Sequence, residues 1–253
     1  MLDAVLWGLI QGLTEFLPIS SSGHLVLVPA LLGRDGPDLA TSAMLHLGTL
    51  AAVLAYYRTE LAEMLRLTTV GKRLLRFLVI GTIPAATAGL LFETRLERLN
   101  EQPRLVAVAM LLAGGAMVAT RWIAVGLRRR DAAGTGDAVV IGLAQAVALI
   151  PGVSRSGATI AAGLNQKFAR RDSANLAFLL GIPAIAGAGL LSFVSLAREG
   201  AGGIEGNLFL GMGVAAVAGY AAIALLLGVI RRTGLVPFGW YCIGFALLSL
   251  VLL

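Results

Sequence analysis

Charged residues are scarce in this chain of 253 residues, where Asp, Glu, Lys and Arg together make up 13%. Apolar residues make up 58%, and the mean hydropathy is +0.87. Soluble domains carry about 25% charged residues, so this composition excludes an ordinary soluble domain. Apolar segments recur along the whole length, which predicts a single integral membrane domain over residues 1–253.

Cysteine and common active-site motifs are also nearly absent. The single Cys242 excludes an internal disulfide. The sequence has no Gly-x-x-x-x-Gly-Lys phosphate loop, no His-x-x-x-His zinc pair and no cysteine cluster. The net charge of +6 comes from Lys and Arg in short loops between apolar segments, a pattern that sets membrane topology. We therefore predict a lipid bilayer and no nucleic acid as the partner.

Six apolar stretches are long enough to cross a bilayer, which takes about 20 apolar residues. They lie near residues 40–57, 76–92, 104–126, 174–195, 206–230 and 235–253. Two further stretches, 4–17 and 139–150, are too short, and each ends in a cluster of Pro, Ser and Gly. A short helix, a break and a second short helix are typical of a re-entrant hairpin. We expect an all-α integral membrane protein with six transmembrane helices and two re-entrant helical hairpins.

The two hairpins resemble copies of each other at a shift of 134 residues, because six of the sixteen positions from 8 to 23 match. The matched pairs are Gly8 with Gly142, Leu9 with Leu143, Gln11 with Gln145, Ser20 with Ser154, Ser22 with Ser156 and Gly23 with Gly157. Three predicted spans separate the copies, and an odd number inverts the second copy. The sequence thus predicts an inverted-topology repeat with halves of about 1–130 and 131–253.

Basic residues are unevenly distributed between the two sides of this predicted topology. Thirteen of the 20 Lys and Arg fall on one side and five on the other. The thirteen lie in 58–76, 127–137, 167–171 and 231–232. The positive-inside rule makes that side cytoplasmic, so we expect both termini outside and the first hairpin to enter from outside. The sequence leaves open whether the protein forms a homodimer.

A carboxylate stands out in the first hairpin. Gln11 and Glu15 are four residues apart, so they share one helix face. A carboxylate at the bilayer centre costs about 2.5–3.5 kcal/mol on insertion scales and normally marks a functional site. The alternative is a structural Glu15 that pairs with a backbone group or with Arg155.

Hydroxyls and an imidazole follow Glu15. Ser20, Ser21 and Ser22 either cap the second short helix or offer hydroxyls and N–H groups to an anion. His24 is either a proton carrier near neutral pH or a core histidine with satisfied hydrogen bonds. We expect His46, on the first full span, to be structural or at most supporting.

The second hairpin supplies a cation in "PGVSRSGAT". Arg155 presents a planar fork that suits phosphate, and the hydroxyls of Ser154, Ser156 and Thr159 flank it. A carboxylate beside a phosphate is unfavourable unless a divalent cation lies between them, and Mg²⁺ takes one or two carboxylates together with phosphate oxygens. If the hairpins meet, these residues predict a phosphoryl-transfer site.

Two motifs carry a resemblance to a known family. "GLIQGLTEFLPISSSGH" (8–24) and "PGVSRSGAT" (151–159) resemble the signature motifs of the undecaprenyl-diphosphate phosphatases of the bacitracin-resistance type. The resemblance implies a bacterial plasma-membrane enzyme that hydrolyses this polyprenyl diphosphate lipid to undecaprenyl phosphate and inorganic phosphate. It also implies recycling of the carrier for cell-wall synthesis, bacitracin resistance and dependence on Mg²⁺ or Ca²⁺. The family's acidic motif often carries two glutamates, and here the first is Gln11.

The resemblance also assigns roles to residues. The expected catalytic residues are Glu15, Ser21, His24 and Arg155; the expected substrate-binding residues are Ser20, Ser22, Ser154, Ser156 and Thr159; the expected metal ligands are Glu15 and Gln11. Ser21 is the candidate nucleophile with His24 or Glu15 as its base, and attack by a water on the metal with His24 as base is the alternative. A transporter or flippase of polyprenyl phosphate is the alternative function, because inverted repeats are common in transporters.

Overall fold

The computed structural model describes residues 1–199 and 206–253, and within these ranges every regular element is helical. The α-helices are α1 (Leu2–Phe16), α2 (Ser21–Leu32), α3 (Leu39–Tyr56), α4 (Arg58–Leu65), α5 (Thr69–Asn100), α6 (Pro103–Ala119), α7 (Thr135–Val147), α8 (Arg155–Asn165), α9 (Arg170–Glu199), α10 (Gly206–Thr233) and α11 (Val236–Leu252). Two 3₁₀ turns, η1 (Thr120–Trp122) and η2 (Arg130–Ala132), lie between α6 and α7. The all-α prediction is confirmed for the described residues.

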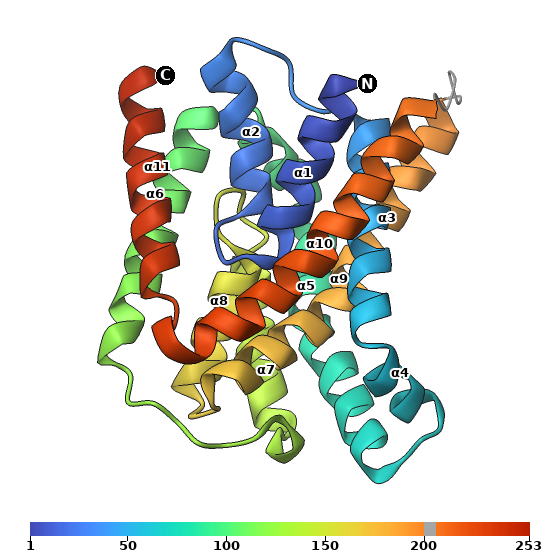
Figure 1. Ribbon diagram of the computed structural model, residues 1–253, viewed down its shortest axis with the longest axis vertical. Coiled ribbons are helices and arrows are strands. Elements are labelled where there is room, and N and C mark those ends of the chain that lie inside the picture. The colour runs from blue at the N-terminus through green and yellow to red at the C-terminus, as the bar shows by residue number, and fades with distance from the viewer. Residues whose placement is uncertain (200–205) are drawn as a thin grey trace.

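The first polar break lies between α1 and α2, which run in opposite directions (Figure 1). Pro18 disfavours helical backbone at the residue before it, and Leu17 is extended with φ −63° and ψ 140°. Ser20 then caps α2, because its Oγ accepts a hydrogen bond from the Gly23 N–H at 3.1 Å. The predicted sequence of short helix, break and short helix is present here.

A second pair of short helices, α7 and α8, has the same arrangement. Gly152 allows the turn at φ +92°, where other residues are strained. Ser154 Oγ accepts a hydrogen bond from the Gly157 N–H at 3.1 Å and so caps α8. The two helix pairs enter from opposite ends of the molecule, and their breaks meet near its centre (Figure 1).

Fewer helices than predicted are long and apolar enough to cross a bilayer. In the described residues four helices qualify, which are α5, α6 continued by η1, α9 and α10. The pair α3 and α4 makes a fifth if it forms one span bent by 75°. Helix α11 has 17 residues and rises about 25 Å, somewhat less than a hydrocarbon core of about 30 Å. These helices indicate a multi-pass membrane protein.

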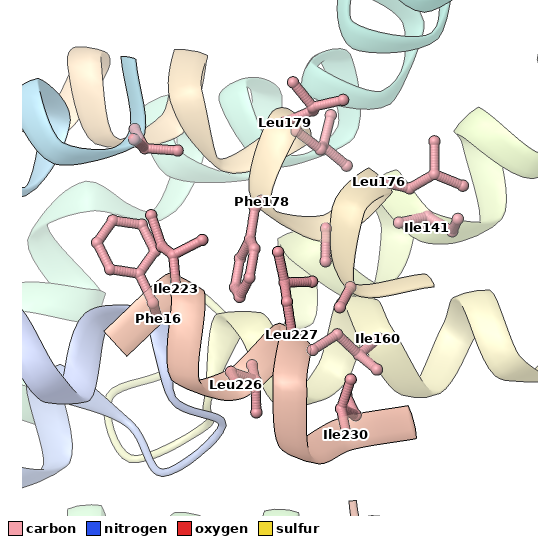
Figure 2. Packing of buried hydrophobic residues seen from close by; sticks show 14 of the residues in the cluster. Phe16, Ile141, Ile160, Leu176, Phe178, Leu179, Ile223, Leu226, Leu227 and Ile230 are labelled. Atoms are coloured by element: carbon pink, nitrogen blue, oxygen red, sulfur yellow. The ribbon is translucent and has the colours of Figure 1, made fainter. Parts of the chain in front are cut away.

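A shared core holds both helix pairs in place. Phe16 of α1 meets Phe178 of α9 edge to face, with ring centroids 5.7 Å apart. Ile141 of α7 and Ile160 of α8 are fully buried in the same cluster, beside Leu227 of α10 (Figure 2). Because close-packed interiors leave little freedom, this core fixes the two breaks relative to α9 and α10.

Candidate active site

Glu15 lies at the centre of the candidate site, on the last turn of α1. Its Oε2 accepts hydrogen bonds from Ser21 Oγ at 2.6 Å and from Gln11 Nε2 at 3.2 Å. Its Oε1 pairs with Arg155 Nη2 at 3.1 Å. The side chain of Glu15 is 7% exposed and that of Arg155 is 16% exposed, so little water screens their attraction. The carboxylate thus joins the two polar breaks.

Arg155 begins α8 and points toward α1. Its guanidinium lies against Gly181 of α9, where a Cβ would overlap Nη1. Nη1 is buried and has no hydrogen-bond partner among the described residues. A buried N–H without a partner is costly, and an anionic ligand that reached this atom would supply the missing acceptor.

The hydroxyls around the breaks divide into two groups. Ser20 and Ser154 cap helices, while Ser22 Oγ accepts a hydrogen bond from the Gly152 N–H at 3.3 Å. Ser156 Oγ donates to the Leu17 carbonyl at 3.1 Å, and Thr159 Oγ1 donates to the Arg155 carbonyl at 2.7 Å. Ser20, Ser22 and Ser154 thus accept hydrogen bonds from backbone N–H groups and line the cavity described next. Ser156 and Thr159 donate to backbone carbonyls and do not line it.

A cavity of about 160 Å³ lies between the breaks. Its lining residues are Thr14, Glu15, Ser20, Ser21, Ser22, His46, Ala148, Leu149, Val153, Ser154, Arg155, Ala184, Ile185 and Ala188. A larger cavity of about 890 Å³ shares Ser21, Ser22 and His46 with it and extends to the α2–α3 and α5–α6 connections. Both connections lie at the end of the molecule that carries the two termini (Figure 1). The site therefore has a path to that end.

His24 lies apart from this cavity, although the sequence placed it three residues after Ser21. Its Nδ1 donates to the Ser20 carbonyl at 2.8 Å, and its Nε2 accepts from the Tyr241 hydroxyl at 2.8 Å. The ring also stacks on Phe245 of α11, with centroids 4.8 Å apart. Since both ring nitrogens are engaged, the structure does not bring His24 together with Ser21 and Glu15 as a base.

His46 lies beside the site, which the sequence did not indicate. It lies on α3, is half-buried and lines both cavities. Its Nδ1 donates to the Ser42 carbonyl at 2.8 Å, and its Nε2 has no hydrogen-bond partner among the described residues. The only signal in the sequence is the polar face that it shares with Ser42 and Thr49, spaced four and three residues away.

The chain as a whole also matches a known protein family. The model of a family described as "Bacitracin resistance protein BacA" matches residues 4–248. This chain belongs to that family. The match includes both polar breaks, so the resemblance seen in the two motifs is confirmed.

Relatives in this family share most of their length with the chain. An undecaprenyl-diphosphatase of Geobacter sulfurreducens is 41% identical, with 95% of this chain and 94% of that protein aligned. One of Rubrobacter xylanophilus is 41% identical over 99% of this chain and 97% of its own. One of Moorella thermoacetica is also 41% identical, over 95% and 93% respectively.

The side chains of this BacA-family site offer oxygen ligands to a metal. Among the described residues no group of three or more His, Cys, Asp or Glu comes together, which disfavours a cage built only from protein. Gln11 Oε1, however, is buried without a hydrogen-bond partner in the described part of the chain, and the same side chain touches Glu15. One carboxylate and one amide oxygen fit a hard cation such as Mg²⁺ that takes its other ligands from phosphate and water.

Proposed function

We propose that this protein hydrolyses undecaprenyl diphosphate to undecaprenyl phosphate and inorganic phosphate. The observation that carries the proposal is the 2.6 Å hydrogen bond from Ser21 Oγ to Glu15 Oε2, beside the buried Arg155. Family membership and relatives named for this activity support it. The product would re-enter cell-wall synthesis, and its faster recovery would give the bacitracin resistance in the family's description.

Ser21 is the proposed nucleophile, and Glu15 is its base. Ser21 Oγ forms a bond to the terminal phosphorus while its proton moves to Glu15 Oε2. The bond from that phosphorus to the bridging oxygen breaks, and undecaprenyl phosphate leaves with the electron pair. Water then cleaves the phosphoserine, and Glu15 returns the proton to Ser21. Direct attack by water, without a phosphoserine, is the alternative use of the same residues.

Arg155 is the proposed anion-binding residue. Its unpartnered Nη1 would donate to a diphosphate oxygen, and Nη2 would be shared between that anion and Glu15. Planar guanidinium groups suit phosphate because two parallel N–H groups fit two oxygens. Ser20, Ser22 and Ser154 line the same cavity, where Ser20 hydrogen-bonds to Ser22 and Ser154 to Ser156 at 3.3 Å each, and their hydroxyls would turn toward the anion as further donors.

A divalent cation, Mg²⁺ or Ca²⁺, is the proposed cofactor. Glu15 and Gln11 would hold it, since the first supplies a carboxylate and the second an amide oxygen that is buried and unpaired among the described residues. When bound, the cation would neutralise negative charge on the diphosphate, which otherwise meets the carboxylate of Glu15 unfavourably.

We further propose the bacterial plasma membrane as the site of action, with six spans and two re-entrant hairpins in an inverted-topology repeat. The two matched caps at Ser20 and Ser154 support the repeat, and the excess of Lys and Arg in loops away from the termini supports an outside location for both ends. The apolar tail of the lipid would lie between helices, with its diphosphate in the cavity.

The function is tested by phosphate release from undecaprenyl diphosphate in detergent with Mg²⁺. We expect Glu15→Gln and Arg155→Lys each to lower the rate by about 100-fold or more, because each removes a charge-specific contact. Matched controls are Glu60→Gln and Arg130→Lys, which alter a second ion pair of 2.9 Å far from the site. These controls should keep activity near the wild-type level.

Two results would contradict the proposal. Equal losses of activity in the two control variants and the two site variants would show that removing an ion pair lowers activity by destabilising the fold. No phosphate release by a folded wild-type protein that still binds the lipid would favour transport or flipping of the polyprenyl phosphate instead.

A further inference from the structure

We infer that His46 is the general base that activates water in the second half of the reaction. The inference rests on the proposed hydrolysis and assigns one more residue to the same site. His46 lies on α3, outside both sequence motifs. The side chain nevertheless lines the cavity that contains Glu15, Ser21 and Arg155.

The hydrogen bonds of His46 suit the role of a base. Donation from Nδ1 to the Ser42 carbonyl at 2.8 Å fixes the tautomer with the proton on Nδ1. The lone pair of Nε2 is then free to accept a proton. The ring is half-buried and lines both the 160 Å³ cavity with Glu15 and Ser21 and the adjoining 890 Å³ cavity, so the side chain borders both the site and the space through which water would enter.

The second half of the reaction would be accelerated by a base other than Glu15. In the proposed cycle Glu15 holds the proton taken from Ser21 after the first half and returns it to Oγ as the phosphoserine breaks. While it holds that proton, Glu15 does not accept one from water, and a separate base would. His24 is also unsuitable, since Ser20 and Tyr241 occupy both of its ring nitrogens.

In the proposed step each bond that forms replaces one that breaks, and each proton has an acceptor. The water oxygen forms a bond to phosphorus, the bond from phosphorus to Ser21 Oγ breaks, and the Glu15 proton moves to Oγ. The proton lost by the water moves to His46 Nε2 and leaves through the larger cavity. Inorganic phosphate is released, and every group returns to its starting state.

His46→Asn is the sharpest variant. The asparagine amide nitrogen can replace Nδ1 as the donor to Ser42, while nothing replaces Nε2. We expect phosphate release to fall by about 100-fold, at the low end of what a general base contributes. With substrate labelled on the terminal phosphate, labelled protein should accumulate after acid quench, because only the second half is slowed. Ser21→Ala should remove that label.

Chemical rescue separates a base from a structural residue. His46→Ala should regain activity when free imidazole is added, since the adjoining cavity of about 890 Å³ admits a small base. Thr49→Val is the matched control, because Thr49 lies on the same face of α3 but is fully buried and binds backbone carbonyls. Imidazole should not change the activity of this control.

The outcomes distinguish the two proposals. If the wild type releases no phosphate, the proposed hydrolysis itself fails. If the wild type is active and His46→Asn stays within about twofold of it, the inference about His46 alone is overturned. A loss of activity without accumulation of phosphoprotein and without imidazole rescue would also overturn it.

Discussion

Arg155 reaches the carboxylate of Glu15 across the surface of α9, at a point where that helix has no side chain. A Cβ on Gly181 would overlap Arg155 Nη1, which is the end of a flexible side chain and not backbone. Gly181→Ala should therefore displace the guanidinium and leave the helix in place. We expect kcat/KM for the diphosphate to fall by up to about 100-fold, as for other displacements of about 1 Å, with little change in thermal unfolding.

The same helix offers a matched control for Gly181. Gly187 is exposed and a Cβ there would meet no atom within 4 Å, so Gly187→Ala should leave kcat/KM unchanged. Steady-state kinetics of both variants measures kcat/KM, and thermal unfolding measures their stability. Equal activity in Gly181→Ala and the wild type would mean that the position of Arg155 does not depend on this gap.

The sequence allowed the meeting of Glu15, Ser21 and Arg155 to be predicted because all three lie in matched polar breaks of apolar segments. It could not predict the environment of His24. The partners that engage its ring, Tyr241 and Phe245, lie more than 200 residues away on α11. The place of His46 beside the site was not predictable for a similar reason, since it belongs to neither motif and only tertiary packing brings α3 beside the breaks.

At the scale of elements, the break between α7 and α8 depends on Gly152. Its φ of +92° strains any other residue, and a Cβ would overlap the Val106 carbonyl of α6. Gly152→Ala should lose about 2–6 kcal/mol of unfolding free energy, from strain of about 1–3 kcal/mol and a similar cost of overpacking. Urea or thermal unfolding in detergent measures the loss.

The variant Gly33→Ala separates the cost of backbone strain from the cost of overpacking. Gly33 also has a positive φ, +60°, but a Cβ there would meet no atom within 4 Å. Gly33→Ala should therefore cost only about 1 kcal/mol, the strain of the left-handed conformation at the end of α2. If both variants lost the same stability, the contact with Val106 would have no part in fixing the break.

Helix existence was predictable from apolar runs, but helix limits were not. The predicted span 76–92 lies within α5, which continues from Thr69 to Asn100 because Leu, Glu and Arg favour helix outside the apolar region as well. The prediction for 104–126 was too long, since α6 ends at Ala119 and a 3₁₀ turn follows. Hydropathy reports contact with lipid, whereas backbone hydrogen bonds decide where a helix ends.

At the scale of the whole molecule, the two breaks contact each other through matched serines. Ser22 accepts a hydrogen bond from the Gly152 N–H, and Ser156 donates to the Leu17 carbonyl. Ser22 and Ser156 are partners in the 134-residue shift, so matched positions of the two helix pairs each contact the break of the other pair. Neither helix pair alone satisfies these groups, so each break depends on the other.

The proposed inverted repeat predicts which loops face which side of the membrane. Arg34 lies in the α2–α3 connection at the end with the termini, and Arg129 lies in the α6–α7 connection at the opposite end (Figure 1). Both side chains are more than half exposed. With a membrane-impermeant maleimide, Arg34→Cys should react in right-side-out vesicles and Arg129→Cys only in inverted ones, because most Lys and Arg belong on the cytoplasmic side.

The wild-type chain serves as the background in this labelling, since its single Cys242 is buried at 1% exposure and packs on the Pro18 carbonyl. Reaction of both variants from the same side would contradict hairpins that enter from opposite faces. Reaction with the sides exchanged would keep the inverted repeat but reverse its orientation. In that case the larger cavity would open to the cytoplasm.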